Sequence, residues 1–335
     1  MDTLNKTHLT SQSTLSQFDS RQQTADSSDI GLQRRHTLLV IVVTYNAMQW
    51  IDRCLDSVKE WDIFVVDNGS SDGTQQYIAK NYPDVIFRQS KSNLGFGKAN
   101  NIGLQYAIEG GYDFVYLLNQ DAWVYPRTID KLIELGCQHP EYGVLSPFHI
   151  QGNTKHLDAV FGSSFCSWQA NKAFVEDLYF ARKLQEVYEA DFVSAAHWLI
   201  SRTCVETVGG FSPAFYHCGE DNNYLHRLRY KGFKVGVVPQ VKAVHDREHR
   251  APSLTKDLYI THYVDPIIWL SNINEKMSCF SKIGILLLVI KNTLKYKSLK
   301  PVAHFMRLLK KYGYIAQCAK KSKEDGAFLS TPSHS

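Results

Sequence analysis

Blocks of apolar residues alternate with polar turns along the first half of the chain, and the spacing within each block predicts its structure. The run 38–43 is short, continuous and rich in β-branched residues, which is typical of a strand buried on both faces. Ile51, Cys54, Leu55 and Val58 then recur at helical spacing. Further strands are expected at 63–66, 85–87, 114–118 and 144–145, and further helices after Thr74, from about 97 to 108, and with Pro126 as a first helical residue.

Strands that alternate with helices in this way predict a parallel sheet with helices on both faces. Residues 150–190 are aromatic-rich and show no clear period, so no element bounds are predicted there. Beyond them, a helix is expected to open at Gly219 and a strand-like region to run over 237–244. We therefore expect an α/β domain over residues 36–250, followed by a helical, basic extension over 251–335.

The first 35 residues differ from the rest, because Ser, Thr and Gln fill 16 of the 35 positions. Such a segment buries too little apolar surface to offset its ordering entropy, so residues 1–35 are predicted to be a disordered polar tail. The whole chain of 335 residues is 44% hydrophobic and 21% charged, which is typical of a soluble globular protein. A net charge of +4 is too small to indicate a nucleic-acid partner.

The seven cysteines include no C-x-x-C pair, so the sequence favours reduced thiols in a cytoplasmic protein over a zinc ribbon or a disulfide framework. No apolar run is long enough for a spanning helix, and no signal peptide is expected. Charge is nevertheless unevenly distributed. Residues 275–325 hold 12 basic and 3 acidic side chains, a net of +9, so the remainder of the chain is net acidic.

Polar clusters follow three of the predicted strands, at residues 44–46, 67–72 and 119–121. The carboxyl ends of parallel strands meet at one edge of a sheet, where ligands bind in this class of fold. Each cluster taken alone could also be an ordinary turn, because Asn, Asp, Gly and Ser dominate turns. Three clusters at the same predicted edge favour a binding site.

Two further groups of residues suggest chemistry. Asn119 and Asp121 offer oxygen ligands suited to Mg2+ or Mn2+, with a turn or cap as the alternative. Glu220 and Asp221 are adjacent carboxylates at a predicted helix start, where one could be a general base or both could be capping residues. Spacing does not decide between the two carboxylates. His245 is a candidate third metal ligand.

Alternatives to these assignments remain at two places. His217 and His249 are rivals of His245 as the metal-binding histidine, and a lone histidine is more often structural. Gly95 and Gly97 form only a bare G-x-G, which is weak support for a phosphate loop.

Four motifs in order, with three later ones, resemble the inverting family-two glycosyltransferases, and within them the rhamnosyltransferase-like branch. The first four motifs occupy 42–46, 65–74, 93–103 and 118–121, and the later three occupy 208–211, 219–221 and 244–245. The resemblance implies a GT-A fold, that is, a Rossmann-like, mostly parallel α/β sheet with helices on both faces. It also implies a nucleotide-diphosphate-sugar donor, a divalent metal, a nucleotide-sugar half over about 36–150 and an acceptor half over about 151–250.

By the same resemblance, particular residues take particular roles. The donor and its nucleotide would be bound by Thr44, Tyr45, Asn46, Asp67, Asn68, Lys98, Asn101, Asn119 and Gln120. Asp121 and His245 would contact the metal, and Asp221 would be the catalytic base with Glu220 as its neighbour. The common D-x-D pattern has Asn119 at its first position here. The loss of one negative charge implies weaker metal affinity and more dependence on the donor's phosphates.

The implied reaction is sugar transfer, with inversion, to a hydroxyl of a saccharide or lipid-linked acceptor during cell-surface polysaccharide synthesis. A sugar nucleotidyltransferase is the second enzyme reading, but residues 44–46 replace the Gly-rich loop it needs after the first strand. A non-catalytic nucleotide-sugar or glycan-binding protein is the third reading, which Asn119 supports and the Glu220–Asp221 pair opposes.

The basic segment 276–323 mixes lysines with apolar residues and could form an amphipathic helix. Such a helix can lie on an anionic membrane, here the inner face of the plasma membrane, or it can pack on the catalytic domain.

Overall fold

The computed structural model describes residues 36–247, 253–275 and 279–330. The predicted polar tail at 1–35 and the rival ligand His249 lie outside the described residues. The described residues from His36 onward belong to one compact unit. Its strands are β1 (Leu38–Thr44), β2 (Asp62–Asp67), β3 (Ile86–Gln89), β4 (Phe114–Asn119), β5 (Ala122–Val124), β6 (Tyr142–Ile150), β7 (Tyr188–Glu189), β8 (His197–Ser201) and β9 (Lys234–His245).

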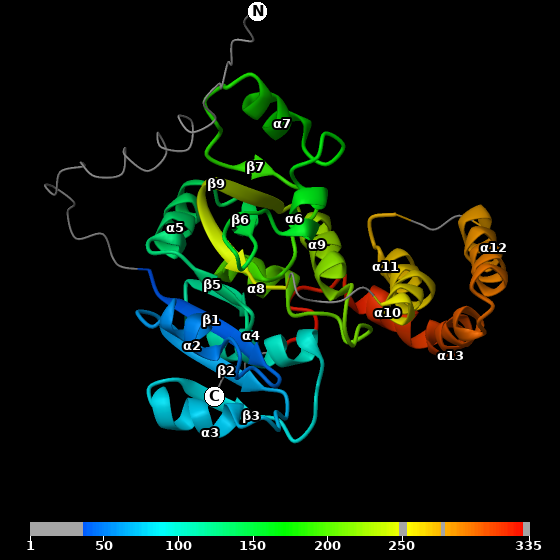
Figure 1. Cartoon of the computed structure of the whole chain (residues 1–335), viewed down its shortest axis with the longest axis horizontal. Helices are drawn as coiled ribbons and strands as arrows, with labels where there is room; N and C mark the ends of the chain where they lie inside the picture. The colour runs from blue at the N-terminus through cyan, green and yellow to red at the C-terminus, as the bar shows by residue number, and fades with distance from the viewer. Residues whose placement is uncertain (1–35, 248–252, 276–278, 331–335) are drawn as a thin grey trace, which may run out of the picture. The chain divides into compact units, whose positions relative to one another are not determined.

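The helices of the sheet domain and of the C-terminal region alternate with or follow these strands (Figure 1). They are α2 (Ile51–Asp56), α3 (Thr74–Asn81), α4 (Phe96–Gly110), α5 (Thr128–Gln138), α6 (Ala159–Ser164), α7 (Lys172–Tyr179), α8 (Arg202–Val208), α9 (Glu220–Tyr230), α10 (Leu254–Tyr259), the π-helix η1 (Ile260–Val264), α11 (Asp265–Ser271), α12 (Cys279–Tyr296) and α13 (Lys300–Lys321).

All strands join one mixed sheet in the order β3-β2-β1-β4-β8-β6-β9-β5, with β7 paired to β9. The first four strands of this order are parallel, as predicted. Strand β8 runs antiparallel to both β4 and β6, and β6 and β9 are again parallel to each other. The expected mostly parallel α/β sheet is confirmed, with β5, β7 and β8 as its antiparallel strands.

The register of the parallel strands brings their polar ends to one level. Thr44 at the end of β1 is paired with Asp67 at the end of β2, and Val43 is paired with Asn119 at the end of β4. Three polar clusters that are far apart in sequence therefore meet at one sheet edge, as the sequence predicts. This edge positions the candidate site.

The continuous apolar run in β1 is explained by burial on both faces of the sheet. Leu39 and Ile41 pack with residues of α4, α8 and α9 on one face, whereas Val40 and Val42 pack with α2, α3 and α5 on the other. Side chains alternate between the two faces of a strand, and helices cover both faces, so both sets are fully buried.

Helix α5 begins at Thr128, two residues after the predicted Pro126, because Arg127 adopts a left-handed conformation (φ 63°).

The irregular region 150–190 contains α6, α7 and β7. Asp158 and Asn171 cap the two helices by accepting hydrogen bonds from the backbone N–H groups of Phe161 and Phe174. The aromatic residues of this region pack against one another, and Phe161, Phe165 and Phe174 are buried in the core on the α4 side of the sheet. Both helices have at most eight residues, too short for a clear helical period.

The C-terminal helices pack on the sheet domain. Tyr263 and Val264 of η1 and Ile267 of α11 form a small core with Leu308 of α13 and with Phe215 from the loop before α9. Helix α12 packs on α13 in turn. In the described part of the chain, no helix is long and apolar enough to cross a bilayer.

After α13 the chain returns to the sheet domain and binds to the loop after α8. The Ala327 carbonyl accepts a hydrogen bond from Gly210 N (2.8 Å), and the Thr207 carbonyl accepts one from Gly326 N (3.2 Å). Gly209 makes this approach possible, because a Cβ there would lie 2.0 Å from the Ala327 carbonyl oxygen. Its φ of +83° also disfavours any side chain.

We predict that Gly209→Ala destabilises the protein by about 1–3 kcal/mol, the cost of one strained residue, and frees the C-terminal segment. Urea unfolding and limited proteolysis near Ala327 measure the two effects. Gly284→Ala in α12 is the matched control, because nothing lies within 4 Å of its added Cβ. Equal stability of wild type and Gly209→Ala would contradict the close approach.

Candidate active site

A cavity of about 290 Å³ lies beyond the carboxyl ends of β4 and β9. Asn119 ends β4 and His245 ends β9, and both line this cavity. Glu220 and Asp221 of α9 line it from another side. A further wall of the cavity comes from α10, η1 and α11, which the sequence assigned to a separate extension. The residues of this wall are Lys256, Ile260, Val264, Asp265 and Ile268.

At the same edge of the sheet as Asn119, Asp67 organises the loop after β2. Its carboxylate accepts hydrogen bonds from the Thr44 hydroxyl (2.9 Å), Gly69 N (3.0 Å), Ser70 N (2.9 Å) and Gln75 Nε2 (3.0 Å). Both Thr44 and Asp67 are fully buried. Asp67 thus holds the ends of β1 and β2 together. Its predicted contact with a nucleotide base, and that of Thr44, stay predictions.

The next residues of the β1 cluster are tied to the neighbouring clusters. Gln120 accepts a hydrogen bond from Tyr45 N (2.6 Å) and donates one to the Tyr45 carbonyl (3.2 Å). The Asn46 side chain accepts a hydrogen bond from Ser71 N (2.8 Å). These bonds fix the backbones of all three clusters, and they leave the Tyr45 ring half exposed at the sheet edge.

Three predicted donor residues lie on or next to α4. Asn68 bonds to the loop before α4, through the Gly95 carbonyl (3.4 Å), and Lys98 is exposed on the first turn of that helix. Asn101 lies elsewhere: its side chain accepts a hydrogen bond from Phe211 N (2.6 Å) and donates one to the Phe211 carbonyl (2.9 Å).

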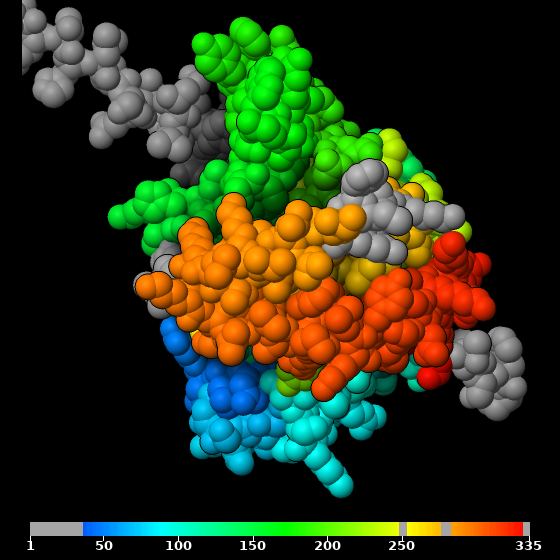
Figure 2. Space-filling view, turned by 90° about the vertical axis from the view of Figure 1, so that its right-hand side faces the viewer, coloured from blue at the N-terminus to red at the C-terminus, as the bar shows by residue number. Residues whose placement is uncertain are grey.

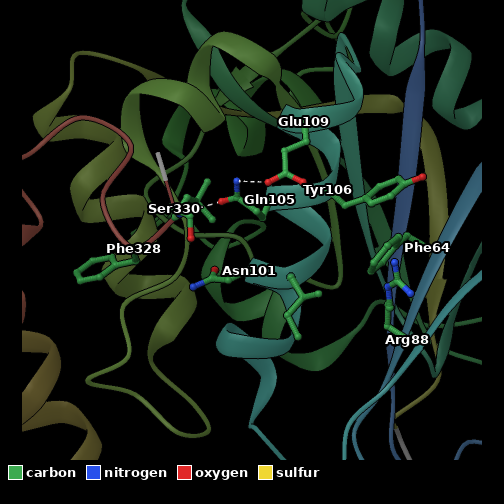
Figure 3. Close-up of a pocket in the computed structure, with 10 residues that line it drawn as sticks. Phe64, Arg88, Asn101, Gln105, Tyr106, Glu109, Phe328 and Ser330 are labelled. Carbon is green, nitrogen blue, oxygen red and sulfur yellow. Dashed lines mark hydrogen bonds between the residues drawn. The ribbon is translucent and has the colours of Figure 1, made fainter. Parts of the chain in front are cut away.

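Asn101 also lines a different pocket, between α4 and the returning C-terminal segment (Figure 3). In that pocket Gln105 accepts a hydrogen bond from Ser330 N (2.8 Å). The structure therefore does not bring Asn101 to the cavity of Glu220 and Asp221. Its observed contacts connect α4 to the loop that precedes α9.

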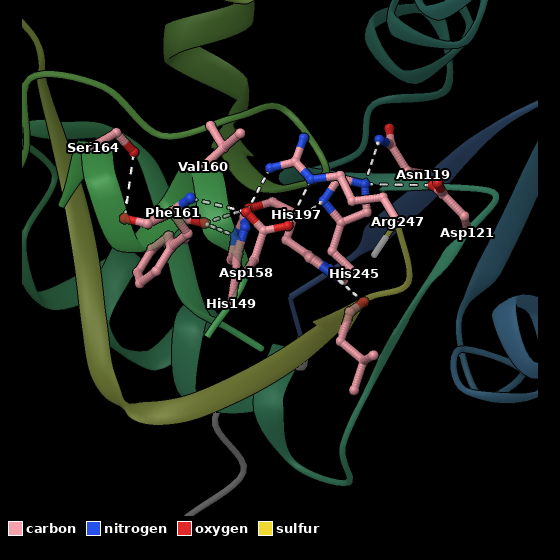
Figure 4. A network of polar contacts seen from close by, with 12 residues as sticks. Asn119, Asp121, His149, Asp158, Val160, Phe161, Ser164, His197, His245 and Arg247 are labelled. Carbon is pink, nitrogen blue, oxygen red and sulfur yellow. Dashed lines mark hydrogen bonds and ion pairs between the residues drawn. The ribbon is translucent and has the colours of Figure 1, made fainter. Parts of the chain in front are cut away.

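Asn119, Asp121 and His245 converge as the sequence predicts (Figure 4). His245 Nε2 lies 3.5 Å from Asp121 Oδ1 and 3.5 Å from Asn119 Nδ2. Two ligand atoms at that separation can both lie about 2.1 Å from one ion. Asn119 Oδ1 is buried without a hydrogen-bond partner, so an oxygen ligand is left over beside the pair. The residues present therefore fit a divalent cation.

The protein offers this cation few ligands of its own. Across the described residues, no group of three or more His, Cys, Asp and Glu side chains could hold a metal ion. The remaining ligands would have to be oxygens of a substrate or water. The weaker metal affinity implied by Asn119 in place of an aspartate stays a prediction.

His245 has a second carboxylate neighbour that the sequence did not reveal. Its Nδ1 lies 3.6 Å from Asp158 Oδ2, and Arg247 donates to both oxygens of Asp158 at 2.6 and 2.5 Å (Figure 4). Burial raises the pKa of Asp158, but the hydrogen bonds from Arg247 and Phe161 outweigh burial and hold the pKa below its ordinary value. Because the sequence predicts no element bounds in 150–190, it gave no signal for this residue.

A buried histidine on β8 forms a hydrogen bond with the backbone at the end of β9. His197 Nε2 lies 2.9 Å from the Val244 carbonyl, so this nitrogen carries the proton, and Nδ1 accepts from the Tyr116 hydroxyl (3.0 Å). Burial lowers the pKa of His197 to about 3, so the ring stays neutral. Val244 and hence His245 are held in place by an uncharged hydrogen-bonded chain.

Glu220 and Asp221 begin α9 directly after Gly219, which has a left-handed φ of +84°. A Cβ on Gly219 would lie 2.8 Å from Val264 Cγ1, so only glycine lets η1 and α11 pack this closely on the carboxylates. Burial, and then the charge of Asp221, raise the pKa of Glu220 to about 8. Burial also raises the pKa of Asp221. His217, the other rival ligand, is exposed at the rim of the same cavity.

One half of the domain is a parallel sheet with polar strand ends, and the other half carries a pair of carboxyls. This combination is typical of a GT-A nucleotide-sugar transferase. Residues 39–209 match the model of glycosyl transferase family 2, which is about half of the chain. The chain belongs to this family, and it is a glycosyltransferase.

Curated relatives transfer rhamnose. An N-acetylglucosaminyl-diphospho-decaprenol L-rhamnosyltransferase of Mycobacterium tuberculosis is 24% identical over 260 residues, covering 70% of this chain and 84% of the relative. The dTDP-rhamnosyl transferase RfbF of Shigella flexneri is 21% identical over 211 residues, covering 62% of this chain and 68% of the relative. The resemblance to the rhamnosyltransferase-like branch is confirmed.

Solved structures show the same fold. The chain is similar to S. aureus TarS 1-349 in complex with UDP-GlcNAc, with a TM-score of 0.50, 18% identity, and coverage of 84% of this chain and 81% of that one. Against a longer TarS chain the TM-score is again 0.50, and the similarity spans 42% of that chain. The GT-A fold expected from the sequence is confirmed.

We predict that Asp67→Asn destabilises the protein by about 1–3 kcal/mol. In the wild type, several donors point at the Asp67 carboxylate, and in the variant some of them would face an amide nitrogen, which cannot accept their hydrogen bonds. Urea unfolding followed by circular dichroism measures the loss. Asp84→Asn, at an exposed position, serves as the control. Unchanged stability would mean that the Asp67 network does not hold β1 and β2 together.

Proposed function

We propose that this glycosyltransferase moves a sugar from a nucleotide-diphosphate donor to a hydroxyl of a saccharide or lipid-linked acceptor, with inversion, in cell-surface polysaccharide synthesis. One observation carries the proposal: a single cavity is lined both by His245, whose ring contacts Asp121, and by the two carboxyls that begin α9. A donor diphosphate and an acceptor hydroxyl need these two kinds of group within one sugar's reach.

The donor side of the proposal rests on the joined strand ends. Thr44, Tyr45 and Asn46, with Asp67 and Asn68, form one connected edge, and Asn119 and Gln120 continue it toward the cavity. Lys98 is exposed on the neighbouring helix, where a cation can approach a diphosphate. We assign the nucleotide to this edge and its diphosphate to the side of Asp121.

Asp121 Oδ1 and His245 Nε2, with the unpartnered Asn119 Oδ1, would hold a Mg2+ or Mn2+ ion. When bound, such an ion stabilises negative charge on a leaving diphosphate. The chain's own contribution is to fix these ligands. His197 and Asp158 hold the end of β9 and the His245 ring, and Gln120 holds the loop that carries Asp121.

Asp221 is the base in this proposal. Its carboxylate takes the proton from the acceptor hydroxyl, the hydroxyl oxygen bonds to the anomeric carbon, and the bond from that carbon to the diphosphate oxygen breaks. The electron pair of the broken bond leaves with the nucleoside diphosphate. Because the attack is a single displacement from the opposite face, the anomeric configuration inverts, and no enzyme nucleophile is needed.

The acceptor enters, in this proposal, along the wall formed by α10, η1 and α11. Ile260, Val264 and Ile268 make this wall apolar, and Lys256 adds a cation at its exposed rim. A cation beside an apolar wall suits an acceptor that combines phosphate with a lipid. The relative from M. tuberculosis, whose name specifies a diphospho-decaprenol acceptor, supports the same choice.

We predict that Asp221→Asn lowers turnover by at least about a thousandfold, because the amide cannot take the acceptor's proton. Release of nucleoside diphosphate from a panel of nucleotide sugars, with Mn2+ and an acceptor extract, measures the loss, and calorimetry measures donor binding. Donor affinity should stay within about twofold. Asp130→Asn, on an exposed face of α5, is the control. Wild-type turnover in Asp221→Asn would remove the base assignment.

We also propose that the protein is cytoplasmic and binds the inner face of the plasma membrane through the basic segment 276–323. In its described part, α12 buries Ile285 and Val289 but exposes a second apolar stripe at helical spacing. The exposed stripe is Ile283, Leu286, Leu287, Ile290 and Leu294. Figure 2 shows α12 and α13 forming one outer surface (orange to red). Lys291 and Lys295 lie beside the stripe, where their positive charges would attract the head groups of anionic lipids.

We predict that Leu287→Glu combined with Leu294→Glu abolishes flotation with vesicles containing anionic lipid, because both side chains would have to enter the lipid. Leu178→Glu combined with Tyr179→Glu is the matched control, since these apolar residues of α7 are also more than half exposed. Wild type and control should float alike. If the α12 variant floats as well as the wild type, α12 is not the membrane contact.

A further inference from the structure

The two adjacent carboxyls of α9 have different surroundings. Glu220 is only 6% exposed, and its Oε2 is buried without a hydrogen-bond partner. Asp221 is half-buried, and its Oδ1 accepts hydrogen bonds from Asn222 N (2.9 Å) and Asn222 Nδ2 (3.4 Å). Spacing alone gave no reason to assign them different roles, whereas these contacts do.

We propose that Glu220 takes part in the reaction as a neutral carboxylic acid that donates a hydrogen bond to an oxygen of the bound substrate, while Asp221 carries the single negative charge of the pair. Glu220 keeps its proton throughout, and only Asp221 accepts one. The inference rests on the proposed function and adds a second working residue to it.

The location of the charge follows from hydrogen bonding. Two neighbouring carboxyls, one of them buried, cannot both ionise at low cost, so the pair favours one charge. Donors that point at a carboxylate stabilise its charged form. Each carboxyl receives a hydrogen bond from its own backbone N–H, but Asp221 has two further donors from Asn222, whereas the buried Oε2 of Glu220 has no partner. The charge therefore belongs on Asp221.

The packing around Glu220 also favours its neutral form. Val264 and Ile268 lie against Gly219, and Gly97 approaches the Glu220 Cβ. Among the described residues, no cation forms an ion pair with Glu220, and burial keeps the pKa of its carboxyl high, at about 8. The titratable and charged groups that face the same cavity are His217, Cys218, Asp221, His245, Arg247, Lys256 and Asp265, with Tyr259 close by.

A neutral acid suits the ligand better than a carboxylate would. Sugar hydroxyls and diphosphates present oxygens, and a second negative charge beside them would repel a diphosphate. A protonated Glu220 instead offers an O–H donor, and the substrate oxygen gives the buried carboxyl the partner it lacks. Donors preorganised in a dry site contribute strongly when the charge on the accepting oxygen grows during the reaction.

The variant Glu220→Gln separates the two roles, because an amide can donate a hydrogen bond but cannot accept a proton at neutral pH. We expect its kcat at pH 7 to stay within about fivefold of wild type, whereas Glu220→Ala loses about a hundredfold. Wild-type activity should fall as pH rises through about 8, and Glu220→Gln should keep its activity there. A Glu220→Gln variant as inactive as Asp221→Asn would overturn the inference.

A stability measurement tests the same inference without turnover. Burial raises the pKa of Glu220 from 4.5 to about 8, so the folded wild type binds more protons than the unfolded chain between these values. Wild-type stability should therefore fall as pH rises across this window. The melting temperature of Glu220→Gln relative to wild type should rise from pH 5 to pH 8 and then level off. Glu60→Gln, at an exposed position, should show no such rise.

If Glu220→Gln does not fold, infrared spectroscopy of the wild type decides. A carbonyl band of a protonated carboxyl should persist at pH 7 and disappear above pH 8, and its absence at pH 7 would overturn the inference. Failure of the proposed function gives a different result. In that case wild type releases no nucleoside diphosphate from any donor, while the melting and infrared results are unaffected.

Discussion

The register of β1 with β2 and β4 is the constraint on which the rest of the site depends. It sets Thr44 beside Asp67 and Val43 beside Asn119, so that three polar segments end at one level. The buried Thr44–Asp67 bond and the Gln120–Tyr45 pair then fix the loops to one another. A slip of one residue would exchange the side chains that face the two helical layers and would separate the polar ends. Core packing and the geometry of the site therefore have the same origin.

The cavity at this edge is lined by polar groups that the protein itself does not satisfy. Asn119 Oδ1 and Glu220 Oε2 are both buried without partners, although buried polar groups are normally paired. Both residues line one cavity, next to the groups proposed for the cation and for the acceptor. The protein gives up some stability here, and a ligand rich in oxygens would restore the missing interactions.

Local pattern was sufficient for most strands and helices of the first half, because continuous apolar runs and helical spacing are local signals, but it did not predict the three-residue strand β5. The polar strand ends, and the meeting of Asp121 with His245, followed from general rules of parallel sheets and from the family resemblance. Asp158 could not be found in this way, since its partners Arg247 and His245 lie about ninety residues away. Nor did the sequence show that Asn101 binds the Phe211 backbone, or that η1 and α11 form a cavity wall, because both depend on long-range packing.

The return of the chain after α13 to the loop beyond α8 has a consequence for biosynthesis. Gly210 and Thr207 bind residues 326 and 327, which a ribosome adds after β9 and after α13. The wall from α10 to α11 is likewise made late, and α13 must be present to support it. A nascent chain can therefore assemble its sheet before the wall of its cavity is made, and that wall gains its packing partner only when α13 has been synthesised.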